Sequence, residues 1–239
     1  MAQKLIPISA LIKKGWDLYI NNLQIFLVPI IISLIPLTIY YLTIYLGGLQ
    51  KTFLVMLLNA LIIIVNLWVA IILIIAIDSL YKNKAVNLNK IYETAFKKIS
   101  SYFWVTILSV LAALAGLILF IIPGIIFMIW YSFAPFINIL EEKNNKGLVA
   151  LKASKNLVLG RWWPTFWRLL IPALVVYLIL IIVITGVFYL ITNGNLNLES
   201  ANQSLMINIL ISLTSLIITP LLLSFPVILY NNLKETKQN

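Results

Sequence analysis

The residues of this chain best suited to binding chemistry are two arginines and three tryptophans within eight consecutive positions: Arg161, Trp162, Trp163, Trp167 and Arg168. A guanidinium presents a planar fork of N–H donors that matches phosphate oxygens, and tryptophan is enriched where a membrane meets water. The two arginines are seven residues apart, so a continuous helix would place them on one face, about 10 Å apart.

This cluster predicts a binding site for an anionic lipid headgroup. Pro164 can occupy the first turn of the following helix, where its missing N–H is harmless. The free N–H groups of that turn would then lie beside the arginines. The alternative is an aromatic belt, with arginines that only reach from the apolar layer to the interface.

A second group of polar side chains interrupts otherwise apolar runs at helical spacing. The group comprises Asn59 and Asn66 in one run, and Asn208, Ser212, Ser215 and Thr219 in another. Each set shares one face of a helix. These side chains either form hydrogen bonds between helices or line a polar cavity or substrate path.

The residue types argue against an enzyme. The chain has no histidine and no cysteine, and its seven acidic residues lie at the ends of apolar runs or in polar segments. Adjacent Glu141 and Glu142 cannot face each other on a helix. Because no phosphate-binding glycine loop or metal-ligand cluster occurs, we expect no metal and no cofactor, and we interpret the carboxylates as solvated charges.

The elements that carry these residues are membrane helices. Of the 239 residues, 62% are hydrophobic and 10% are charged, whereas soluble domains carry about 25% charged residues. The net charge of +10 lies in short blocks between apolar runs, which argues against nucleic-acid binding. The runs are long enough for six spans, at about residues 23–46, 53–77, 102–122, 125–140, 162–192 and 205–230.

Amphipathic segments precede the first, third and fifth spans. Residues 1–22, 87–99 and 141–160 each combine an apolar stripe of period 3.6 with basic residues on the other face. Pro123-Gly124 predicts a turn between the third and fourth spans. We therefore expect an all-α integral membrane protein with six transmembrane helices in three hairpins, each preceded by an amphipathic cytoplasmic-side helix, as a threefold repeat.

The orientation follows from the distribution of lysine and arginine. Sixteen of these residues lie in the segments that one side of the membrane would hold, and Lys51 alone lies on the other. Since positive residues concentrate in cytoplasmic loops, both termini are expected in the cytoplasm.

The central stretch resembles a known prokaryotic family. Its residues are Pro123-Gly124-Ile125, Trp130, Ser132, Ala134-Pro135, Glu141, Ala150-Leu151-Lys152-Ala153-Ser154, Gly160 and Trp163. These are similar to the membrane domain of some glycerophosphoryl diester phosphodiesterases and to related stand-alone multi-span proteins. The resemblance implies a six-span protein of a bacterial or archaeal plasma membrane. It implies no phosphodiesterase activity, because that activity belongs to a separate soluble domain.

We therefore expect a non-catalytic membrane protein that interacts with lipids or organises the membrane, with anionic membrane lipids as its partners and no nucleic acid. The alternative is a transporter or permease component for a small solute, including an amphipathic one.

Overall fold

The protein is built from helices. In a computed structural model, residues 5–47, 52–141, 147–191 and 201–238 are described, and no strand occurs within those ranges. The helices are α1 (Ile8–Asn21), α2 (Leu23–Gly47), α3 (Thr52–Tyr81), α4 (Leu88–Leu119), α5 (Ile121–Tyr131), α6 (Ala134–Leu140), α7 (Leu148–Val158), α8 (Trp162–Ile191) and α9 (Ala201–Gln238).

Six of the helical stretches are long and apolar enough to cross a membrane. Five of them are the helices α2, α3, α4, α8 and α9, and the sixth is the pair α5 and α6. A helix of about 20 residues spans the 30 Å hydrocarbon core of a bilayer. The prediction of an all-helical, multi-pass membrane protein with six spans is therefore confirmed.

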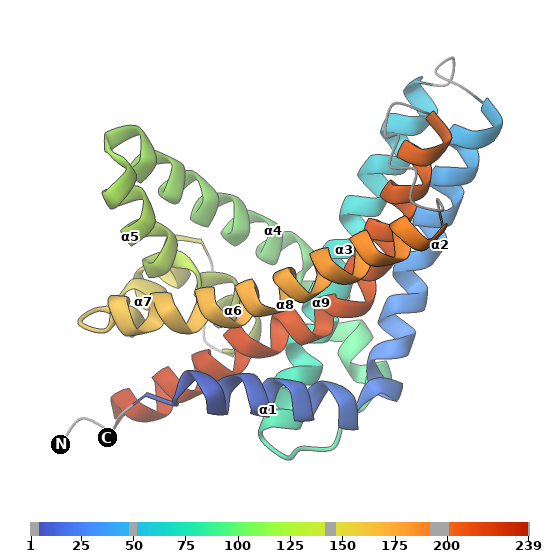
Figure 1. The fold of residues 1–239 in the computed structure, drawn as a ribbon. Helices are drawn as coiled ribbons and strands as arrows, with labels where there is room; N and C mark the ends of the chain where they lie inside the picture. Colours follow the sequence, from blue (N-terminus) through green and yellow to red (C-terminus); the bar gives the residue numbers. More distant parts are fainter. Residues whose placement is uncertain (1–4, 48–51, 142–146, 192–200, 239) are drawn as a thin grey trace.

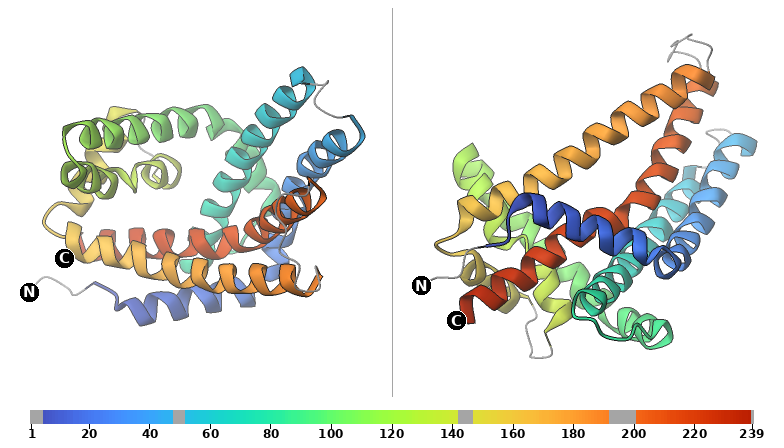
Figure 2. Two further views of the ribbon diagram at one scale, coloured as in Figure 1. Left: turned by 45° about the horizontal axis from the view of Figure 1, so that its top comes forward. Right: turned by 60° about the horizontal axis from the view of Figure 1, so that its bottom comes forward.

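The helices form two arms that diverge from a common base (Figures 1 and 2). The pair α4 and α5 makes one arm. The other arm contains α2, α3, the second half of α8 and the first half of α9. Helices α1, α6 and α7 lie at the base, together with the C-terminal half of α9.

The hydrophobic core lies in this base. Residues 71–74 of α3 and 227–230 of α9 are fully or almost fully buried there, and Leu11 of α1 and Phe133 pack in the same cluster. The hydroxyl of Tyr19 in α1 donates to the carbonyl of Ile217 in α9 at 2.9 Å, and burial raises the pKa of this phenol. The arms instead expose many apolar side chains, as helices that face lipid do.

The turn between α4 and α5 differs from the prediction. The only residue between the two helices is Phe120, which is extended, with φ −171° and ψ 161°. Pro123 and Gly124 lie in the first turn of α5 instead. Pro123 fits there because an N–H in the first turn has no partner within the helix. The prediction of a Pro-Gly turn is wrong.

Three predicted boundaries also shift. Residues 88–99 are not a separate helix but the first turns of α4, which continues without a break into its apolar part and ends at Leu119. The polar residues after Tyr230 are the last turns of α9. In the third amphipathic segment, helix α7 covers only Leu148–Val158, and residues 142–146 lie outside the described part.

Candidate functional site

Arg161 immediately precedes α8, and the local sequence explains its position. Gly160 adopts φ +80°, a conformation that favours glycine. The N–H of Arg161 then donates to the carbonyl of Val158, and its own carbonyl accepts from Thr165 N. Pro164 lies in the first turn of α8, as expected.

The two arginines contact different parts of the chain. One terminal nitrogen of Arg161 donates to the Thr236 hydroxyl at 2.7 Å, and the other to the carbonyl of Leu233 at 3.4 Å. Both partners belong to the last turns of α9. The guanidinium therefore joins the start of α8 to the end of α9.

Arg168 binds the segment that precedes α1. Its Nε donates to the carbonyl of Ile6 at 2.7 Å, and one terminal nitrogen donates to the carbonyl of Leu5 at 3.3 Å. The other terminal nitrogen donates to Pro164 in its own helix. The amide of Ile6 in turn donates to Asn232 of α9 at 2.9 Å, so α8 and α9 hold this segment from two sides.

All these partners are neutral oxygens, and that matters for binding. A guanidinium has five N–H groups, so the bonds above leave three on Arg161 and two on Arg168. The positive charge of each arginine is also not neutralised by these bonds. Both arginines can therefore still attract an anion, but from positions that the protein has fixed.

The three tryptophans surround this start of α8. Trp163 and Trp167 are 53% and 37% exposed, and their rings meet edge-on at 5.5 Å between centroids. Trp162 is partly buried against the core. The five predicted residues therefore lie at one end of α8, but helical spacing places the exposed indoles of Trp163 and Trp167 on a different face of the helix from the two arginines.

A small pocket with two lysines lies close to Arg161. It has a volume of about 320 Å³ between α6, α7 and α9, and its polar lining residues are Glu141, Asn156, Lys234 and Lys237. Lys234 pairs with Glu141 at 3.0 Å, and Lys237 donates to the carbonyl of Asn156. Lys237 follows Thr236, the partner of Arg161, so the pocket and Arg161 form one basic region.

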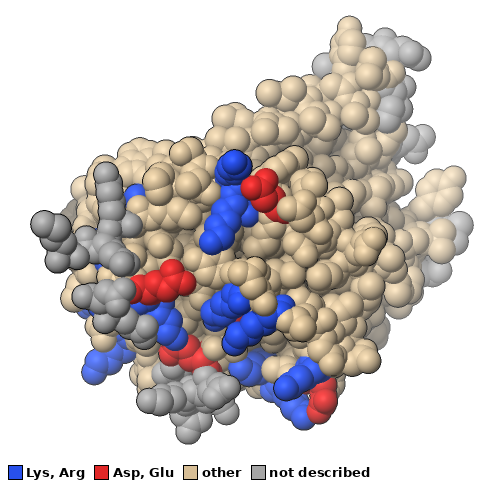
Figure 3. Space-filling view, turned by 90° about the horizontal axis from the view of Figure 1, so that it is seen from below, with Lys and Arg blue, Asp and Glu red and all other residues tan. Residues whose placement is uncertain are grey.

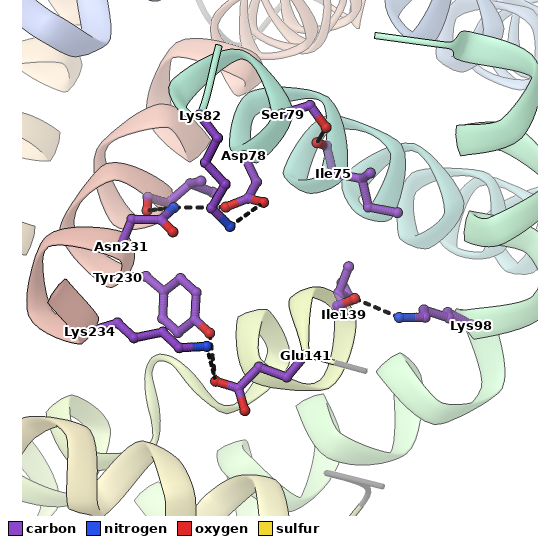
Figure 4. Close-up of polar contacts among 11 residues, drawn as sticks. Ile75, Asp78, Ser79, Lys82, Lys98, Ile139, Glu141, Tyr230, Asn231 and Lys234 are labelled. Atoms are coloured by element: carbon purple, nitrogen blue, oxygen red, sulfur yellow. Dashed lines mark hydrogen bonds and ion pairs between the residues drawn. The ribbon is translucent and has the colours of Figure 1, made fainter. Parts of the chain in front are cut away.

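The same end of the molecule contains polar contacts that the sequence did not predict (Figure 4). Asp78 of α3 accepts from Asn231 of α9 at 2.8 Å and from Lys82 at 2.7 Å, and its side chain is only 13% exposed. Glu141 accepts from Tyr230 at 2.8 Å. The prediction that these two carboxylates are simply solvated is wrong, because each one joins separate helices. No feature of the sequence pairs Asp78 with a residue 153 positions away.

Lysine and arginine side chains gather over this end of the protein (Figure 3). Figure 3 views it from below, and the basic side chains spread across the face where α1, α7 and the end of α9 lie. Among the described residues, ion pairs join Lys82 to Asp78, Lys97 to Glu93 and Lys234 to Glu141. This end of the molecule therefore carries a net positive charge.

The predicted polar faces of α3 and α9 separate into two groups. The hydroxyl of Tyr41 in α2 is 2.8 Å from Ser212 Oγ and donates to the carbonyl of Asn208 at 3.0 Å, so this part joins helices. Asn59 is exposed and bonds only to Val55 in its own helix. Asn66, Ser215 and Thr219, in contrast, line one cavity of about 290 Å³ between α2, α3 and α9.

Ser33 of α2 lines the same cavity and was not predicted as a site residue. Its hydroxyl is buried and has no hydrogen-bond partner. A single serine between two prolines of an apolar run gives no periodic signal. No group of three or more Asp or Glu residues that could hold a metal ion occurs in the described ranges.

Comparisons of the chain with protein-family models, with curated proteins and with solved structures gave no match. The fold and the sites above therefore carry the functional argument.

Proposed function

We propose that the protein is a non-catalytic, six-span protein of a prokaryotic plasma membrane whose basic end binds anionic lipid. The observation that supports this most is the arrangement of Arg161 and Arg168 at the start of α8, where their hydrogen-bond partners among the described residues are neutral oxygens and Trp163 and Trp167 are exposed in the same turns. Each cationic side chain near an anionic surface contributes about 1 kcal/mol. Fixed arginines with free N–H groups add geometric selectivity for phosphate.

The orientation and family belong to the same proposal. We take the basic end as cytoplasmic because positive residues concentrate on that side. The arrangement in three hairpins is supported by the packing of α2 on α3, α4 on α5 and α8 on α9, with the amphipathic segments in α1, in the first turns of α4 and in α7. The resemblance of the central stretch to a prokaryotic membrane family agrees with a six-span protein of a bacterial or archaeal plasma membrane.

The test is lipid retention by a double variant. Arg161→Gln with Arg168→Gln should reduce co-purifying phosphatidylglycerol several-fold in native mass spectrometry, while membrane insertion stays intact because the apolar spans are unchanged. The matched control is Lys90→Gln with Lys152→Gln, which removes two other exposed charges but leaves the arginine pair and should reduce lipid retention far less.

A structural effect can be separated from headgroup binding. Arg168→Lys keeps the charge but loses the fork that holds Leu5 and Ile6. If the lysine variant retains lipid but its α1 amides exchange faster, then the positive charge at residue 168 binds the lipid, and the hydrogen bonds of the guanidinium hold the segment that precedes α1. If the double Gln variant retains as much phosphatidylglycerol as the wild type, the proposal fails.

The cavity between α2, α3 and α9 favours a second candidate, a transporter or permease component for a small solute. A transporter places its binding site near the middle of the membrane, as Asn66 lies near the middle of α3. Flux of a solute into proteoliposomes that depends on Asn66 would support this candidate over the first.

A further inference from the structure

The cavity between α2, α3 and α9 has an unusual hydrogen-bonding composition. Serine and threonine in a helix commonly donate to the carbonyl four residues earlier, as Thr38, Thr43 and Thr214 do. Ser33 is 3% exposed, and its hydroxyl makes no such bond and no other. A buried hydroxyl without a partner costs free energy, so this donor is available for a ligand in the cavity.

The opposite wall supplies acceptors. The hydroxyls of Ser215 and Thr219 donate their protons to carbonyls of α9, so only their oxygen lone pairs remain for a ligand. Leu216 also lines the cavity, and its carbonyl receives no N–H from Pro220, four residues later in α9. This carbonyl is therefore a further acceptor. The Asn66 amide offers both donors and an acceptor, and no described residue bonds to it.

The lining excludes charged ligands. Its residues are neutral serine, threonine, asparagine and aliphatic side chains, and a buried charge without a partner is strongly unfavourable. A hydroxyl group both donates and accepts. It can therefore accept from Ser33 and donate to the Ser215 or Thr219 oxygen at the same time.

The position of the cavity indicates the route of entry. Asn66 is about 21 Å along the helix axis from either end of α3, so it lies near the middle of this span. Asn66 and Ser215 are exposed, so the cavity is open on their side. At this depth the opening faces lipid, and a ligand that enters there must carry an apolar body.

We propose that this cavity binds the hydroxyl end of a neutral amphiphile, such as a long-chain alcohol, which enters from the lipid. Ser33 donates to the ligand oxygen, Ser215 or Thr219 accepts its proton, and Val69 and Leu73 contact the first carbons of its chain. This site differs from the basic end in place and in chemistry.

The test uses a photoreactive hexadecanol with a diazirine near its hydroxyl end, and the wild-type protein in lipid nanodiscs. Crosslinks should map to the cavity residues of α2, α3 and α9. Excess hexadecanol should compete, whereas hexadecane and ionised palmitate should not. Ser33→Ala should lower cavity labelling about tenfold. The matched control Ser224→Ala should not, because Ser224 is equally buried but donates to Leu221 within α9.

Ser33→Ala removes a hydroxyl without a partner, so its melting temperature without ligand should equal or exceed that of the wild type. If Ser33→Ala melts lower, Asn66→Leu takes its place in the same labelling experiment. Any one of three results would overturn the proposal: equal labelling of the variant and the wild type, competition by hexadecane, or labelling spread over the exposed face of α8. Phosphatidylglycerol retention should be unchanged in these variants, so this test can fail without the proposal for the basic end failing.

Discussion

Ser154 shows how one buried hydroxyl can support an interrupted membrane helix. Pro135 cannot donate to the carbonyl of Tyr131, so the fourth span breaks between α5 and α6. At the break, Ser154 of α7 donates to the carbonyl of Trp130 at 2.6 Å and accepts from the N–H of Phe133 at 3.2 Å. Ser132 donates to Ile129 at 2.9 Å. Two side chains thus replace the bonds that the helix has lost.

Ser154→Ala should therefore destabilise the protein by about 1–3 kcal/mol, because it leaves the N–H of Phe133 buried without a partner. Ser109→Ala is the matched control: Ser109 only donates to Val105 in its own helix, and its loss should cost less than 1 kcal/mol. Chemical denaturation in detergent measures both. Equal stability of the two variants would show that Ser154 is not needed at the break.

Helices α4 and α5 approach closely, and glycine explains the approach. A Cβ on Gly124 would lie 2.3 Å from a methyl carbon of Leu117 and 2.9 Å from its Cα. A Cβ on Gly116 would lie 3.0 Å from the Cα of Gly124. Since a one-residue connection leaves the chain no room to separate the two helices, small residues are required at their contact.

Gly124→Ala should lower the free energy of unfolding by about 1–3 kcal/mol, because the main chain of Leu117 must move. Gly186→Ala in α8 is the matched control: no atom lies within 4 Å of its added Cβ. Because alanine favours a helix over glycine by up to about 1 kcal/mol, the control should be neutral or more stable. Thermal unfolding of both variants in the same detergent compares them. If both variants gain stability, the close approach of α4 and α5 is wrong.

Sequence patterns predicted these helices well where the pattern is local. Apolar length located the six spans, and α4 begins after Asn87, a residue type common at helix N-caps, whose side chain accepts from the N–H of Lys90. The turn predicted at Pro123-Gly124 was wrong because glycine is typical both of turns and of close contacts between helices. The partners of Arg161 and Arg168 were also not predictable, since they depend on how the start of the chain and the end of α9 pack together.

The complete molecule separates two environments. The arms expose apolar side chains on most of α8 and on the second half of α4, while the described basic residues gather at the base (Figure 3). The predicted polar faces of α3 and α9 could be interpreted only from the fold. The packing of α2, α3 and α9 places Ser212 in contact with Tyr41 between two helices, whereas Asn66, Ser215 and Thr219 line the cavity that also contains Ser33. The charge distribution, in contrast, is visible in the sequence and leads to a prediction for the whole protein.

If the basic end is in the cytoplasm, the far ends of the arms, which include the first residues of α3 and α9, must be outside. Because the chain has no cysteine, single introduced thiols report on each side. Thr52→Cys at the start of α3 and Asn197→Cys before α9 should react with a membrane-impermeant maleimide in intact cells. Asn145→Cys should react only after the membrane is opened. Residues 145 and 197 lie outside the described ranges, so the reagent tests the orientation independently of the structure. Labelling of Asn145→Cys in intact cells would reverse the orientation, and with it the leaflet from which Arg161 and Arg168 bind lipid.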